Sequence, residues 1–238
     1  MADLTVTPIV ALDVPSRASA LEMVRTLGDR CTFYKVGSEL FTAEGPDMVR
    51  ALREEGREVF LDLKFHDIPQ TVRAAVTSAA RLGVRLLTVH ASGGRAMLEA
   101  AASAASAEGG RCKVLAVSVL TSLDAAAVGE AWGRRDIDVE TEVLRLAGLA
   151  RDAGLDGLVC SAHEARVVRQ EFGSDFELLL PGIRLAGDPA HDQSRVATPS
   201  AAAAAGATYI VVGRAVTGAA DPREAMSRVR AELQNSRR

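Results

Sequence analysis

Residues 60–72 read FLDLKFHDIPQTV, a stretch that begins like a buried β-strand but is dense in charge. Its first residues are apolar, yet Asp62, Lys64, His66 and Asp67 fall within six positions. Charged groups are tolerated inside a protein only when they are paired. The stretch is therefore either an exposed edge or a reaction site, and the remainder of the chain distinguishes the two.

Seven further apolar runs, rich in Val, Ile and Leu, alternate with longer amphipathic or alanine-rich stretches. Strands that alternate with helices form parallel sheets, and near-continuous apolar strands fit a sheet covered on both faces. Eight such units in 238 residues predict a (β/α)₈ barrel, or TIM barrel, as a single domain over residues 1–238. The predicted strands are 8–13, 31–37, 58–64, 85–91, 112–119, 156–161, 177–182 and 208–213.

A doubly wound open sheet is the alternative α/β fold. It would place a glycine-rich GxGxxG turn after the first strand, where the chain reads LDVPSRAS instead. Helices are predicted at 16–28, with Ser16 as the N-cap, and at 138–154, and the alanine run at 201–206 is read as helix. Glycines 56, 83, 154 and 206 precede strands and are expected to end helices.

Composition excludes several classes of function. The net charge of −3 and the scattered arginines provide no basic field for nucleic acid. No apolar run approaches the length of a membrane span, and the N-terminus does not resemble a signal peptide. Cys31, Cys112 and Cys160 are far apart and are read as buried thiols in a reducing compartment, without a zinc pattern. We expect a cytoplasmic protein.

The predicted strand ends carry the charged residues. In barrel enzymes the reactive groups lie at the C-terminal ends of the strands. Asp62 and Lys64 are two apart, so they are expected to point inward together, while Leu61 and Leu63 face the helices. Lys35 on the preceding strand and Asp67 extend this pair into a network of alternating sign. The structural alternative is an ion-pair cluster that merely closes the barrel.

A second group of polar residues follows the last two strands. A long connection rich in Gly, Asp, Pro and Arg begins after residue 182, and Gly213 and Arg214 follow the eighth strand. Barrels commonly bind phosphate in these two loops. We therefore expect a phosphate site here, with the long loop as a lid.

With these residues identified, the chain resembles the orotidine 5′-phosphate decarboxylase family. The stretch LDLKFHDIPQT is similar to the family signature DxKxxD followed by proline and threonine. The resemblance covers nearly the whole chain, because further motifs match in order: ALDVP, YKVGSELF, VLTS, PGIR and VVGRAVTGA. One departure is Gln70, where many relatives have Asn.

The resemblance implies a role for each matching position. Asp13 and Lys35 would hold the ribose hydroxyls, and Asp62, Lys64 and Asp67 would face the carboxylate and C6 of the pyrimidine. The other implied substrate contacts are Thr71 at the ribose, Thr121 at the pyrimidine edge, and Arg184, Gln193, Gly213 and Arg214 at the lid and phosphate. Asp67 and Thr71 would come from the partner subunit of a homodimer.

The implied reaction turns orotidine monophosphate into uridine monophosphate in pyrimidine biosynthesis, without a cofactor or metal. Loss of CO₂ leaves a carbanion at C6 that no carbonyl delocalises, so a fixed cation beside C6 is the stabilisation that the site can offer. Lys64 would be that cation and then the proton donor. Asp62 would in addition strain the substrate carboxylate.

Three other functions fit parts of the pattern. A magnesium-dependent sugar-phosphate decarboxylase or synthase of the same superfamily reuses DxKxxD, but it generally has a further carboxylate on an early strand, where this chain has Lys35. A Schiff-base aldolase would need an uncharged Lys64. A non-catalytic nucleotide-binding barrel could dispense with the charge network. His66 and His90 are read as hydrogen-bonding or packing groups rather than metal ligands.

Overall fold

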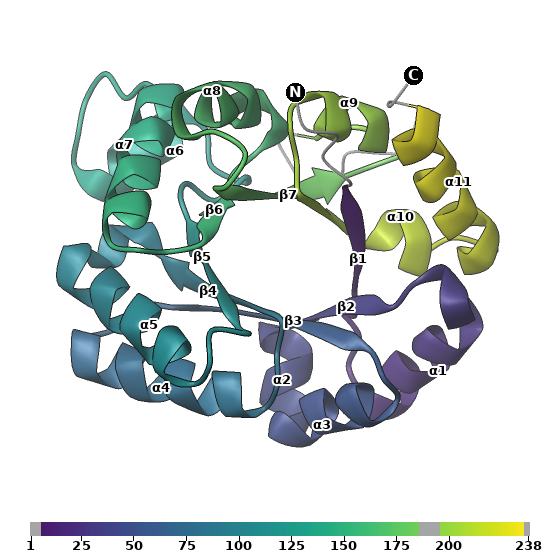
Figure 1. The fold of residues 1–238 in the computed structure, drawn as a ribbon. Helices are drawn as coiled ribbons and strands as arrows, with labels where there is room; N and C mark the ends of the chain where they lie inside the picture. Colours follow the sequence, from purple (N-terminus) through teal and green to yellow (C-terminus); the bar gives the residue numbers. More distant parts are fainter. Residues whose placement is uncertain (1–5, 186–195, 236–238) are drawn as a thin grey trace.

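Eight parallel strands close into a barrel in the computed structural model, which describes residues 6–185 and 196–235 (Figure 1). Each strand pairs with the next in sequence, and the eighth pairs with the first, so the predicted barrel is confirmed and the open sheet is wrong. The strands are β1 Thr7–Ala11, β2 Phe33–Gly37, β3 Glu58–Phe65, β4 Leu86–His90, β5 Lys113–Val117, β6 Gly157–Val159, β7 Glu177–Ile183 and β8 Tyr209–Val212.

Helices form a ring around the barrel (Figure 1). Three of the strands are followed by two α-helices rather than the single one expected. The α-helices are α1 Arg17–Leu27, α2 Ser38–Glu44, α3 Pro46–Glu54, α4 Pro69–Arg81, α5 Arg95–Ala107, α6 Ala125–Trp132, α7 Val139–Asp152, α8 Ala162–Phe172, α9 Pro199–Ala204, α10 Arg214–Thr217 and α11 Pro222–Asn235. Two 3₁₀ turns, η1 Gly28–Arg30 and η2 Ala91–Gly93, complete the described elements.

The helix ends follow the local signals in the sequence. The Ser16 hydroxyl accepts the backbone N–H of Ser19 at 3.3 Å, which caps α1 as predicted. The four glycines expected to end helices all have left-handed φ angles, 72°, 78°, 82° and 90° for positions 56, 83, 154 and 206. Each lets the chain leave a helix and turn into the following strand.

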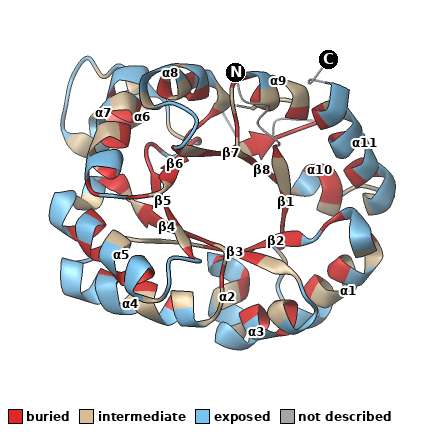
Figure 2. Cartoon of the chain, in the orientation of Figure 1, coloured by how far each residue is buried: buried red, intermediate tan, exposed pale blue. Residues whose placement is uncertain are grey.

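Two hydrophobic layers stabilise the barrel. One lies between the strands and the helices, and the other fills the barrel interior. On β1 the alternation is direct, since Ile9 and Ala11 belong to the interior layer and Val10 belongs to the outer layer. Figure 2 shows buried residues along the strands and on the helix faces that turn towards them.

The three cysteines are buried, as predicted, and none of them forms a disulfide. Burial, followed by the nearby Asp156 carboxylate, raises the pKa of the Cys112 thiol to about 12, so this thiol remains protonated at neutral pH. In the described part of the chain, no helix is both long enough and apolar enough to cross a membrane.

Candidate active site

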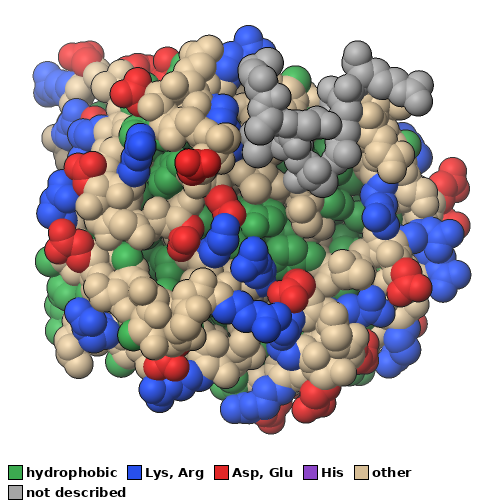
Figure 3. All heavy atoms as spheres, viewed as in Figure 1, with side chains coloured by type: hydrophobic (Ala, Val, Ile, Leu, Met, Phe, Trp, Pro, Cys, Tyr) green, Lys and Arg blue, Asp and Glu red, His purple; other side chains and the backbone are tan. Residues whose placement is uncertain are grey.

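A pocket of about 480 Å³ opens where the strands run into the βα loops. In Figure 3, hydrophobic side chains are visible in a hollow at the centre of this face, with acidic and basic side chains beside them. Phe60, Val117, Val159, Leu179 and Val211 line the pocket and also belong to the interior layer, so the packed barrel core forms its floor. The predicted site residues that line it are Asp13, Lys35, Asp62, Lys64, Thr121, Arg184, Gly213 and Arg214.

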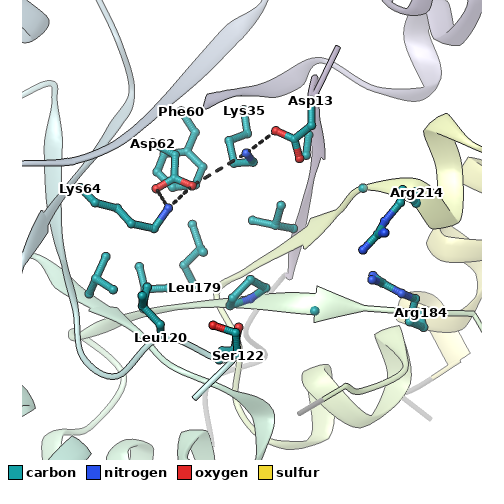
Figure 4. A pocket seen from close by; sticks show the side chains of 18 of the residues that line it. Asp13, Lys35, Phe60, Asp62, Lys64, Leu120, Ser122, Leu179, Arg184 and Arg214 are labelled. Atoms are coloured by element: carbon teal, nitrogen blue, oxygen red, sulfur yellow. Dashed lines mark hydrogen bonds and ion pairs between the residues drawn. The ribbon is translucent and has the colours of Figure 1, made fainter. Parts of the chain in front are cut away.

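Charged side chains of alternating sign form a chain along one side of the pocket (Figure 4). The Lys35 ammonium lies 2.8 Å from an Asp13 oxygen and 3.8 Å from an Asp62 oxygen. The Lys64 ammonium contacts both Asp62 oxygens, at 2.8 and 2.9 Å. The side chains of Lys35 and Asp62 are only 11% and 13% exposed, so their pairing offsets the cost of burying two charges.

The backbone at Lys64 departs from a regular strand. Lys64 has a φ of 49°, in the left-handed region that residues with a side chain rarely adopt. The pairing of β3 with β4 shifts register between Leu61 and Phe65, so Lys64 lies in a bulge. Leu61 and Leu63 pack in the outer layer as expected. Lys64 therefore meets Asp62 inside the barrel, but through a bulge that strand alternation did not predict.

Asp67 and Thr71 lie apart from this chain of charges. Both are exposed, and the Asp67 carboxylate accepts the backbone N–H of Ile68 at 2.6 Å. Among the described residues, Asp67 forms no ion pair with Lys64, so the network does not extend to Asp67 within this chain. Ile68 beside it is 67% exposed and is the most exposed large hydrophobic side chain among the described residues.

Two arginines lie on the other side of the pocket. Figure 4 shows the guanidinium groups of Arg184 and Arg214 turned towards each other, across the pocket from Lys64. Arg184 follows β7, is buried and donates to the carbonyl of Ile183 at 2.9 Å, while Arg214 begins α10 directly after Gly213. Thr121 is buried just after β5. Gln193, predicted in the lid, lies outside the described residues.

Two residues that the sequence did not single out shape the charged side of the pocket. A Cβ atom at Gly37 would lie 2.8 Å from the Lys35 ammonium, so the absence of a side chain there leaves space for Lys35. The Thr88 hydroxyl bonds both Asp62 and the Lys64 backbone. Strand alternation could have indicated both, because residues two apart on a strand face the same side. Gly37 lies two residues after Lys35, and Thr88 lies two residues before His90.

His66 and His90 lie side by side at the ends of β3 and β4, with ring centroids 5.4 Å apart. Burial is the main cause that lowers the pKa of His90, and His66 and Lys64 lower it further, while Asp62 acts in the opposite direction. His90 is thus held neutral at physiological pH. Within the described residues, no group of three or more His, Cys, Asp or Glu side chains could hold a metal ion.

The chain is similar to known proteins over nearly all of its length. Residues 7–229 match the family described as "Orotidine 5′-phosphate decarboxylase / HUMPS family". Proteins named orotidine 5′-phosphate decarboxylase from Halorhodospira halophila and Nitrosococcus oceani are 50% and 48% identical, covering 94% and 95% of this chain and 94% and 97% of theirs.

Solved structures show the same similarity. The crystal structure of orotidine 5′-phosphate decarboxylase from Lactobacillus acidophilus superposes with a TM-score of 0.85 at 37% identity and covers 95% of this chain and 98% of its own. The family match, the identity and the shared barrel each extend over nearly the whole chain. The chain therefore belongs to the orotidine 5′-phosphate decarboxylase / HUMPS family.

Proposed function

We propose that this chain decarboxylates orotidine 5′-monophosphate to uridine 5′-monophosphate in pyrimidine biosynthesis, as a carbon–carbon lyase that uses no cofactor. The observation that carries the proposal is the chain of charges from Asp13 through Lys35 and Asp62 to Lys64, across the pocket from two arginines. This arrangement supports a substrate with a reacting anionic ring at one end and a phosphate at the other.

The two sides of the pocket would divide the substrate between them. Arg184 and Arg214, with Gly213 and Gln193, would bind the phosphate, since guanidinium groups form charge-assisted hydrogen bonds to phosphate oxygens. Asp13 and Lys35 would hold the ribose hydroxyls, and Thr121 would contact the pyrimidine edge. Binding energy from the phosphate, far from the reacting carbon, is then available to close the site around the ring.

Lys64 would carry the chemical step. When the bond between C6 and the carboxylate breaks, its electron pair stays on C6 and CO₂ leaves. The Lys64 ammonium, held by both oxygens of Asp62, would stabilise this carbanion and then give it a proton. Because the ion pair exists before substrate binds, little reorganisation is needed when charge develops at C6.

The site would be completed by a second copy of the chain. Asp67 and Thr71 would reach into the partner's pocket in a homodimer, a role supported by their exposure and by the exposed Ile68 between them. Asp67 would then add a second carboxylate beside the partner's Lys64. The absence of disulfides among the three cysteines is consistent with a reducing compartment, and we propose that the enzyme acts in the cytoplasm.

A magnesium-dependent sugar-phosphate decarboxylase or synthase is the second candidate, since the family name covers HUMPS enzymes as well. Lys35 argues against it, because its ammonium lies 2.8 Å from Asp13 and would repel a metal ion there. The named relatives at 50% and 48% identity also favour the first candidate.

A spectrophotometric assay of orotidine monophosphate consumption tests the proposal. We expect turnover by the wild type that survives EDTA, and a loss of about 10³-fold or more in kcat for Lys64→Ala with substrate binding retained. Absence of wild-type turnover would refute the function, and a loss of less than about tenfold would remove Lys64 from its role. Activity that is abolished by EDTA would favour the magnesium enzyme.

A further inference from the structure

One residue of β4 faces a three-residue segment of β3. Leu61 pairs with Leu87 and Phe65 pairs with Val89, so four steps along β3 correspond to two steps along β4. Thr88 is the only β4 residue between these two pairs, opposite Asp62, Leu63 and Lys64. The side chain at position 88 is therefore the β4 side chain placed beside the bulge.

The Thr88 hydroxyl makes two hydrogen bonds into the bulge. It accepts the backbone N–H of Lys64 at 3.1 Å and donates to Oδ1 of Asp62 at 2.9 Å. A backbone N–H can only donate, so the hydroxyl hydrogen is directed to the carboxylate. The same Oδ1 accepts from the Lys64 ammonium at 2.9 Å. Thr88 thus fixes the carboxylate that orients Lys64 and also fixes the Lys64 backbone.

These bonds explain how an unfavourable backbone persists. A left-handed φ at a residue with a side chain is strained unless its surroundings hold it in place. In the bulge the Lys64 N–H has lost its ladder partner, and the Thr88 hydroxyl supplies a replacement. Thr88 is 1% exposed and does not line the pocket, so it cannot touch a substrate there.

We propose that Thr88 is the positioning residue for Lys64: its hydroxyl sets the distance and direction between the Lys64 ammonium and the Asp62 carboxylate. This inference rests on the proposed decarboxylase function and assigns a role in it to a residue buried behind the site. Loss of the hydroxyl lets the bulge relax and moves the ammonium away from C6, which slows the chemical step more than it weakens binding.

The test compares Thr88→Val, which keeps the volume and removes the hydroxyl, with Thr88→Ser, which restores it. The matched control is Thr208→Val. The Thr208 hydroxyl likewise accepts a backbone N–H, from Leu178 at 3.1 Å, and it accepts from a charged side chain, Arg169 at 3.2 Å. Thr208 directly precedes β8, so it lies at the end of the barrel away from the pocket. Each valine variant loses one bond to a backbone N–H and one bond to a charged side chain, so the loss of such bonds alone does not distinguish the two variants.

The readout is the single-turnover rate with enzyme in excess, because product release can mask the chemical step. We expect Thr88→Val to slow it by about tenfold to 10²-fold with KM little changed, and Thr88→Ser and Thr208→Val to stay near the wild type. A rate for Thr88→Val within about threefold of the wild type, or an equal loss in Thr208→Val, overturns the proposal. If Thr88→Val does not fold, Thr88→Ala is compared with Thr88→Ser by the same criteria.

A crystal structure of Thr88→Val separates this proposal from the proposed function. We expect the Lys64 ammonium to leave hydrogen-bonding distance of at least one Asp62 oxygen. A structure in which Lys64 keeps its left-handed φ and both contacts overturns the role of Thr88. If the wild type does not consume orotidine monophosphate, the proposed function is wrong, and this structural result still decides the role of Thr88.

Discussion

Mixing two inactive variants, Lys64→Ala and Asp67→Asn, is expected to restore about a quarter of wild-type activity. The reason lies in the position of Asp67, which bonds its own neighbour Ile68 and forms no ion pair with Lys64 among the described residues of one chain. If Asp67 acts in the partner's site, each site takes Lys64 from one chain and Asp67 from the other. Each pure variant then carries one defect in both of its sites.

The magnitude follows from how the subunits assort. In a hybrid dimer, one site receives both defects and the other receives neither. Equal amounts that assort at random give about half hybrids, each with one intact site of two, hence about a quarter of the wild-type activity. The variants are unfolded together, refolded and assayed for orotidine monophosphate consumption, and mass spectrometry confirms that hybrids have formed.

A matched mixture controls for non-specific recovery. Asp62 contacts Lys64 at 2.8 Å within one chain, so hybrids of Lys64→Ala with Asp62→Asn carry one defect in every site. This mixture is expected to show no activity above the sum of its pure components. The reasoning about Asp67 is refuted if the Asp67→Asn mixture behaves in the same way although hybrids are present.

Three further predictions concern the pocket and its surroundings. Arg214→Ala should raise KM about 10- to 100-fold by removing a charge-assisted bond to phosphate, and it should not weaken a substrate that lacks the phosphate. Gly37→Ala should lower kcat/KM by about tenfold or more with an unchanged melting temperature, because its Cβ would lie 2.8 Å from the flexible end of the Lys35 side chain. The control is Gly148→Ala, whose Cβ would meet only a ring atom of Phe172, at 3.9 Å. The pKa of His90 is lowered in the folded protein, so its contribution to stability is full above its unfolded pKa of about 6.5 and is lost as the pH falls through its folded pKa. Below about pH 6.5, the urea midpoint of His90→Gln should therefore fall less steeply with decreasing pH than that of the wild type.

The barrel was predictable because each of its signals is local. An apolar run predicts a strand wherever it occurs, and a glycine after an amphipathic stretch predicts a helix end. The strand ends were less accurate, since the predicted strand 156–161 is only Gly157–Val159 in β6. The second helix after β2 was also missed, although Gly45 followed by Pro46 marks the break between α2 and α3.

The position of Lys35 beside Asp62 was predictable from the order of the strands. Once neighbouring strands are known to be parallel, residues near their C-terminal ends must meet at one end of the barrel. The register places Gly37 opposite Asp62, which gives the Lys35 side chain space to reach both carboxylates. The space at Gly37 could be recognised only from the register between β2 and β3, which apolar periodicity alone does not determine.

The backbone conformation of Lys64 could not be predicted from the sequence. Strand alternation predicted correctly that Asp62 and Lys64 meet. It assumed a regular strand, however, in which Lys64 would have an extended φ. The Lys64 N–H bonds the hydroxyl of Thr88, which lies 24 residues further along the chain on β4 and comes into reach only when β4 pairs with β3. No window of sequence around Lys64 contains that information. If Thr88 has the role proposed here, the geometry of the reacting ammonium is determined by a side chain that does not line the pocket.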